Sequence, residues 1–150
     1  MKIGLACDHG GFELKEEIKA FLKSINQDPI DLGTFSDVPV DYPDYATLVA
    51  EKVSQGELER GILICGTGIG MTIVANKFRG VRAALANDLY SSRYSREHTD
   101  ANVLVLGGRI VGKGLAKEIV RLWLATPFEG GRHQRRLEKI EALEEKNFKK

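Results

Sequence analysis

Short apolar runs and longer amphipathic stretches alternate along this chain. Four of the runs do not alternate with polar residues, which predicts strands buried on both faces of a sheet. They fall within residues 2–7, 62–64, 81–86 and 103–106. A weaker run at 29–32, closed by Gly33, predicts one more strand. Between the strands, apolar residues recur at helical spacing within 14–25, 46–53 and 116–124.

Turn residues and caps set the remaining boundaries. The segment 34–44 contains Pro39 and Pro43 and is predicted to be a surface loop. Residues 71–77 are expected to be the start of a helix. Asn87 or Asp88 is a suitable cap for a segment that reaches His98.

Five strands that alternate with helices predict an α/β fold: one parallel sheet with helices on both faces, in a single domain spanning residues 1–150. The last predicted helix, about residues 132–146, has only a narrow apolar stripe of Leu137, Ile140 and Leu143. So thin a stripe suits a helix that docks on a neighbouring subunit rather than a helix of the core.

Composition excludes several classes of function. The chain has 150 residues and a net charge of +1, from 22 basic and 21 acidic residues, so no charge excess favours nucleic acid or an anionic membrane. No apolar run approaches the roughly 20 residues of a membrane span, and the N-terminus is strand-like rather than a signal peptide. The two cysteines, Cys7 and Cys65, do not suggest a disulfide framework, and a cytoplasmic location is expected.

Reactive side chains follow three of the predicted strands. Working residues of parallel sheets gather outside the carboxyl ends of the strands, so residues at these positions are expected to share one site. Asp8 and His9 follow the first strand, Cys65 and Thr67 the third, and Arg109 the fifth.

The third strand leads into a glycine-rich loop, C-G-T-G-I-G, and then into a helix. Free backbone N–H groups and the helix dipole favour an anion at such a point, and they also favour the thiolate form of Cys65. Cys7 is better explained as a small core residue. The loop lacks the lysine of a nucleotide P-loop and the G-x-G-x-x-G spacing, so nucleotide binding is disfavoured.

The histidines and the C-terminal arginines have structural as well as functional explanations. His9 and His98 suit either hydrogen-bonded surface positions or a site, and Asp8 suits a helix cap that can also act in catalysis. The three histidines lie in separate predicted loops, without H-x-x-x-H or C-x-x-C spacing, so neither a metal nor a cofactor is expected. The cluster R-H-Q-R-R at 132–136 is either a solvated face or a phosphate site at a helix start.

Seven segments together resemble the type B ribose-5-phosphate isomerase family, which includes galactose- and allose-6-phosphate isomerases. They are C-D-H-G-G-F, D-Y-P-D-Y-A, G-I-L-I-C-G-T-G-I-G, A-N-K-F-R-G-V-R-A, H-T-D-A-N-V-L, G-G-R-I-V-G and E-G-G-R-H-Q-R-R, spread nearly end to end. The resemblance implies a Rossmann-like three-layer α/β/α fold with a five-stranded parallel sheet. It also implies a homodimer or dimer of dimers with active sites shared between subunits, and a metal-free aldose–ketose isomerisation.

The resemblance also implies a role for each candidate residue. Cys65 is the general base, because the glutamate that some members carry is replaced here by Met71. Thr67 and Asp8 contact the sugar hydroxyls, and His98 opens the furanose ring. The enediolate oxygen is held by the backbone of the glycine loop: Gly66, Thr67, Gly68, Ile69 and Gly70. The phosphate is held by His9, Arg109, Arg132 and Arg136.

Two further positions complete the implied site. Tyr42 lines the sugar pocket, and Thr99 stands where the family usually has asparagine, so a hydroxyl replaces an amide. The expected activity is interconversion of D-ribose 5-phosphate and D-ribulose 5-phosphate in the pentose phosphate pathway. Two alternatives stay open: isomerisation of a hexose 6-phosphate of the allose or galactose type, and non-catalytic binding of a phosphorylated sugar.

Overall fold

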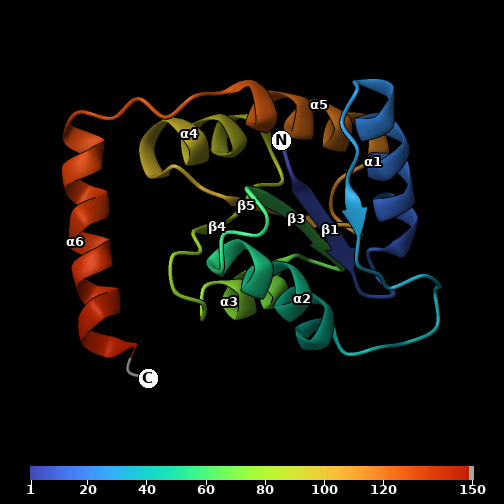
Figure 1. Ribbon diagram of the computed structural model, residues 1–150. Coiled ribbons are helices and arrows are strands. Elements are labelled where there is room, and N and C mark those ends of the chain that lie inside the picture. The colour runs from blue at the N-terminus through green and yellow to red at the C-terminus, as the bar shows by residue number, and fades with distance from the viewer. Residues whose placement is uncertain (149–150) are drawn as a thin grey trace.

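Five parallel strands form the centre of the molecule in the computed structural model, which describes residues 1–148 (Figure 1). In chain order they are β1 (Ile3–Cys7), β2 (Ile30–Asp31), β3 (Arg60–Cys65), β4 (Ala83–Leu85) and β5 (Val103–Gly107). They pair in the order β2-β1-β3-β5-β4, every pair parallel. The last two residues of the predicted 1–150 domain lie outside the described residues.

Helices cover both faces of the sheet, which confirms the predicted three-layer α/β fold (Figure 1). One layer holds α1 (Phe12–Ser24), α4 (Leu89–Thr99) and α5 (Lys113–Ala125), and the other holds α2 (Tyr42–Ser54) and α3 (Ile69–Ala75). The sixth helix, α6 (Arg132–Asn147), stands apart beside the β4 edge. Among the described residues, no helix is both long enough and apolar enough to cross a membrane.

The core divides into two apolar clusters because successive strand residues point to opposite faces. Along β1, Leu5 and Cys7 join the cluster under α1 and α5, whereas Ala6 joins the cluster under α2 and α3. Burial raises the pKa of Cys7 to about 12. This thiol is therefore protonated and inert, as expected of a core cysteine.

Two helix starts differ from the expectation. The predicted loop 34–44 ends early, because α2 begins at Tyr42 with Asp41 as its N-cap residue and Pro43 in the first turn. A proline there interrupts nothing, since the first-turn N–H groups have no partner within the helix. Helix α3 spans Ile69–Ala75 and begins two residues before the expected Met71, because Gly68 takes a left-handed φ of 85° and serves as its N-cap residue.

A buried ion pair fastens α1 to the β2 edge of the sheet. Lys15 is completely buried, and its Nζ donates to Asp31 Oδ1 at 2.6 Å and to the Thr34 carbonyl at 2.7 Å. Burial alone would raise the pKa of Asp31, but hydrogen bonds from Lys15 and Lys19 hold that pKa below its ordinary value. The helical periodicity placed Lys15 next to the apolar stripe, and nothing in the sequence identified its partner.

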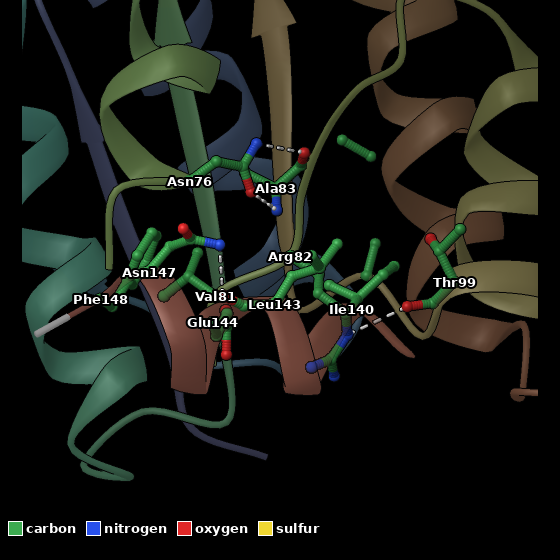
Figure 2. A pocket seen from close by; sticks show the side chains of 12 residues that line it. Asn76, Val81, Arg82, Ala83, Thr99, Ile140, Leu143, Glu144, Asn147 and Phe148 are labelled. Carbon is green, nitrogen blue, oxygen red and sulfur yellow. Dashed lines mark hydrogen bonds between the residues drawn. The ribbon is translucent and has the colours of Figure 1, made fainter. Parts of the chain in front are cut away.

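At the opposite edge, an open groove separates β4 from α6 (Figure 2). Its volume is about 490 Å³, and most of its lining is apolar. Leu137 is buried against the body of the molecule, whereas Ile140 and Leu143 are 43% and 59% exposed and line the groove. In Figure 2 the Asn76 side chain pairs with both backbone groups of Ala83, at 2.9 and 3.0 Å, and so protects part of this edge.

Candidate active site

The strand order creates a crevice between the carboxyl ends of β1 and β3. The chain leaves β1 for β2 on one side and then crosses to β3 on the other, and ligands of open parallel sheets bind at such a reversal. Asp8 directly follows β1 and Cys65 ends β3. The two loops are in contact, since the Asp8 N–H donates to the Ile64 carbonyl at 3.2 Å. The predicted gathering of residues after the first and third strands is confirmed.

Cys65 lies at the start of the glycine loop and is 4% exposed. Its sulfur accepts a hydrogen bond from the backbone N–H of Gly68 at 3.2 Å. Gly68 is required here twice over: its φ is 85°, and a Cβ would lie 2.5 Å from Leu85 Cδ1. The Gly68 N–H holds the sulfur beside the amides of the glycine loop.

Several amides of the loop point to no protein acceptor. Within residues 1–148, the backbone N–H groups of Gly66, Thr67 and Gly70 donate no hydrogen bond, while that of Ile69 donates to Thr67 Oγ1 at 3.2 Å. The loop is held to the turn after β5, because the Gly66 carbonyl accepts the N–H of Arg109 at 3.0 Å. A rigid set of free donors beside a thiol can stabilise an oxyanion formed there.

Asp8 and His9 are oriented by backbone groups. Asp8 is nearly buried, and its Oδ1 accepts the N–H groups of Gly10 and Gly11 at 2.9 and 3.2 Å, so it braces the turn into α1. His9 Nδ1 accepts the N–H of Val40 at 3.1 Å. In the neutral ring the proton is therefore on Nε2, which can donate to a ligand.

Tyr42 and Arg109 complete this first group of residues. A Cβ on Gly70 would lie 2.4 Å from Tyr42 Cε1, so the phenol ring rests directly on the glycine loop. The Arg109 guanidinium lies beside Gly66, and Arg109 and His9 line one depression of about 790 Å³. One chain thus brings together Asp8, His9, Tyr42, Arg109 and the loop 65–70, which we call the Cys65 group.

The remaining predicted residues lie near the amino ends of the strands, on the side of the sheet opposite to Cys65. Helix α4 starts after β4 and ends before β5, so it runs antiparallel to the strands and carries its last turn about 16 Å back toward their amino ends. There the Thr99 carbonyl accepts Arg82 Nε at 3.0 Å, just ahead of β4 (Figure 2). His98 and Thr99 are in this turn. They do not meet Cys65 within one chain.

His98 instead lies against the start of α6. Its ring stacks on that of His133, with centroids 4.1 Å apart and planes 13° apart. Arg132 and Arg136, in the same turns of α6, are exposed. The expected phosphate cluster is therefore divided in one chain. His9 and Arg109 belong to the Cys65 group, whereas Arg132 and Arg136 lie with His98 and Thr99 in what we call the His98 group.

The expectation that the histidines lie in separate loops is wrong, because α4 and α6 bring two of them together. Donor atoms of His98, Glu129 and His133 lie within 4.8 Å of one another, a set that could hold a metal ion. Burial, together with the nearby His98 and Arg132, lowers the pKa of His133. The sequence held the signal for this burial, since His133, Leu137 and Ile140 follow helical spacing.

Thr99 and Asn102 have clear structural contacts. The Thr99 hydroxyl donates to the Ser95 carbonyl at 2.5 Å, so only its lone pairs are available to a ligand. The Asn102 side chain accepts the Arg82 N–H at 2.8 Å and donates to the Gly80 carbonyl at 2.9 Å, which fixes the turn before β4.

Known proteins resemble this chain over nearly its whole length. The family model described as Ribose/Galactose Isomerase matches residues 3–140. Ribose-5-phosphate isomerase B of Escherichia coli is 52% identical, over 97% of each chain. The structure of Clostridium thermocellum ribose-5-phosphate isomerase B is 53% identical, with a TM-score of 0.95 over 97% of this chain and 99% of the other. That of the Mycoplasma genitalium protein with bound ribulose-5-phosphate is 44% identical, with a TM-score of 0.93 over 97% of each chain.

The parallel sheet, the thiol at its strand-order reversal and these matches define an α/β isomerase. The chain belongs to the Ribose/Galactose Isomerase family. The resemblance that the sequence motifs suggested is confirmed.

Proposed function

We propose that this protein interconverts D-ribose 5-phosphate and D-ribulose 5-phosphate through an enediolate, as a step of the pentose phosphate pathway. The observation that carries the proposal is the Gly68 N–H aimed at Cys65 Sγ at 3.2 Å, beside loop amides without a protein acceptor. This arrangement supplies a base and an oxyanion site at one point, which proton transfer next to a carbonyl requires.

Cys65 is the base in this proposal. Its thiolate removes the proton from C2 of the open-chain aldose and returns it to C1. The negative charge that develops on the sugar oxygen is met by the N–H groups of residues 66–70. Thr67 and Asp8 contact the sugar hydroxyls and pass a proton between O1 and O2. Asp8 retains Oδ2 for this role, because its backbone contacts use Oδ1.

The rest of the site comes from a second copy of the chain. His98 protonates the ring oxygen of the furanose, and Thr99 lies beside it. Arg132 and Arg136 join His9 and Arg109 around the phosphate, and Tyr42 lines the sugar pocket. Within one chain the His98 group lies near the amino ends of the strands and the Cys65 group at their carboxyl ends. The two groups can therefore meet only between copies, in a homodimer or a dimer of dimers.

The groove beside β4 supports assembly of this kind. Ile140 and Leu143 leave apolar surface exposed on α6, as expected of a helix that docks on a neighbouring subunit. Helix α3 also exposes Ile69 and Ile73, at 55% and 58%. These exposed apolar faces are where we expect the second copy. Because both thiols are free, we place the protein in the cytoplasm.

The test replaces Cys65 by alanine and uses the second cysteine as the control. We expect Cys65→Ala to keep the fold but to lose turnover of ribose 5-phosphate by several orders of magnitude, whereas Cys7→Ala keeps turnover. Assays with EDTA test whether the reaction needs a metal, and allose 6-phosphate as a second substrate tests the sugar. Near-normal turnover by Cys65→Ala would remove the thiol from the mechanism.

A further inference from the structure

His133 is an unusual residue in α6 because it is buried while its neighbours are not. It is 3% exposed, and of the helix only Leu137 is similarly covered. Arg132 and Arg136 face solvent on the same turns. The imidazole therefore points into the molecule, away from the side on which these arginines can meet a phosphate.

What the ring contacts is His98. The two imidazoles are nearly parallel at 4.1 Å, and Tyr94 lies on His98 with a centroid distance of 4.8 Å and a tilt of 52°. His98 thus contacts two rings, one from its own helix and one from α6. The torsion that turns an imidazole about its Cβ–Cγ bond is otherwise broad, so these contacts select one orientation.

We propose that His133 positions His98 for ring opening, by stacking on its imidazole. This inference rests on the proposed function, in which His98 is the acid that protonates the ring oxygen. His133 touches His98 and acts through it, so it is a positioning residue. Because Arg132 and Arg136 lie on the same helix as His133, the stack also fixes the place of His98 relative to these arginines.

The environment of His133 suits a neutral flat ring. Its Nε2 is buried without a hydrogen-bond partner and lies 3.9 Å from Glu129 Oε2. The charged groups around the pair are two acidic residues, Glu97 and Glu129, and two basic residues, Arg132 and Arg136. Burial, together with His98 and these arginines, lowers the pKa of His133, a direction that favours its neutral form. Because Nε2 makes no hydrogen bond, a phenyl ring can replace the imidazole without losing one.

The geometry argues against a metal centre formed by His98, Glu129 and His133. An imidazole binds a metal along a lone pair in its own plane, with a bond of about 2.0–2.1 Å for zinc. The lone pairs of two rings only 13° from parallel do not converge on one ion. A metal would require one ring to turn and the stack to break.

The experiment compares one reaction that needs ring opening with one that does not. Turnover of ribose 5-phosphate starts from a closed furanose. Ribulose 5-phosphate cannot close such a ring because its O5 carries the phosphate. In D₂O, removal of its C1 proton and return of a deuteron is followed by NMR. This exchange uses Cys65 and the phosphate contacts but needs no ring opening.

We expect His133→Ala to lower kcat for ribose 5-phosphate by about tenfold or more, a fraction of what a general acid contributes. KM and the C1 exchange should change by no more than about twofold. His133→Phe, which keeps a flat ring, should recover most of the lost kcat. Leu137→Ala is the matched control, since it removes buried packing from α6 without touching the stack and should affect both reactions equally.

Four results would overturn the inference. They are equal loss in His133→Phe and His133→Ala, equal loss in both reactions, a selective rise in KM, and zinc binding by the wild type that His133→Ala abolishes. His98→Asn tests the underlying assignment separately. If it slows both reactions equally, the role of His98 in the proposed function fails; if it slows only ribose 5-phosphate turnover while His133→Ala does not, only the positioning role fails.

Discussion

At the scale of single residues, Cys7 and Cys65 show how one side chain acquires two chemistries. Both end a central strand at the same edge of the sheet. The Cys7 thiol donates to the Thr34 carbonyl at 3.9 Å and is buried among apolar side chains, so its pKa rises to about 12. The Cys65 sulfur instead accepts an N–H. The direction of one hydrogen bond distinguishes a structural thiol from a candidate base.

The arginines give a prediction at the same scale. If Arg109, Arg132 and Arg136 bind the phosphate, each alanine substitution should lower kcat/KM for ribose 5-phosphate by about ten- to a hundredfold, because a charge-assisted contact is worth about 1.5–3 kcal/mol. Unphosphorylated ribose never makes the contact and should lose little. Steady-state assays of each variant with both sugars check this, and Arg135→Ala, exposed on the same helix, serves as the control. Equal losses with the two sugars would mean that these arginines bind no phosphate.

At the scale of elements, the Lys15–Asp31 pair holds α1 against β2, and its removal should show in stability. Lys15→Ala leaves a largely buried carboxylate short of a partner, so we expect the free energy of unfolding to fall by about 3–5 kcal/mol. Lys19→Ala removes a partly exposed contact to the same carboxylate and should cost at most about 1 kcal/mol. Urea titrations of the two variants compare them directly; equal effects would contradict the account.

The same pair has a pH dependence of defined sign. The folded-state pKa of Asp31 is below the ordinary 3.8, so its stabilisation is fully present above that pH and is lost as the pH falls through the folded value. Lys15→Ala should therefore flatten the loss of stability in this acidic range.

Helix α6 carries the element-scale prediction about assembly. Replacing Ile140 and Leu143 together by glutamate places charge in the groove while leaving Arg132 and Arg136 intact. We expect the assembly to dissociate and turnover to fall with it, as measured by light scattering and assay at matched concentrations. Lys139→Glu, an exposed charge change on the same helix, should do neither. A double variant that remains assembled and active would show that the groove is not an interface.

The sequence predicted most of the helices and strands, but not the side-chain contacts between distant segments. Apolar runs located the central strands because strands buried on both faces need continuous hydrophobicity. The start of α2 was missed because Pro43 reads equally well as loop or first turn. The His98–His133 stack and the Lys15–Asp31 pair were missed because each joins segments far apart in the chain. Hydrophobic period carries no information about such partners.

At the scale of the whole molecule, one fact organises the site. The Cys65 group lies at the carboxyl ends of the strands, whereas the His98 group lies near their amino ends. The reason is that a helix that follows one parallel strand must return to the amino end before the next strand begins. In a symmetric pair of copies, each Cys65 group can meet the partner's His98 group, so two sites form together. A site completed in this way is the central claim of the account.

Mixing two inactive variants tests that claim most directly. In the proposed homodimer, Cys65→Ala alone or His98→Asn alone gives the same defect in both sites. After subunit exchange, a mixed dimer has one site with both defects and one site with neither. Random exchange of equal amounts should therefore restore about a quarter of wild-type ribose 5-phosphate turnover, because half the dimers are mixed and each has one intact site of two. If Cys65 and His98 act within one chain, every chain is defective and mixing restores nothing.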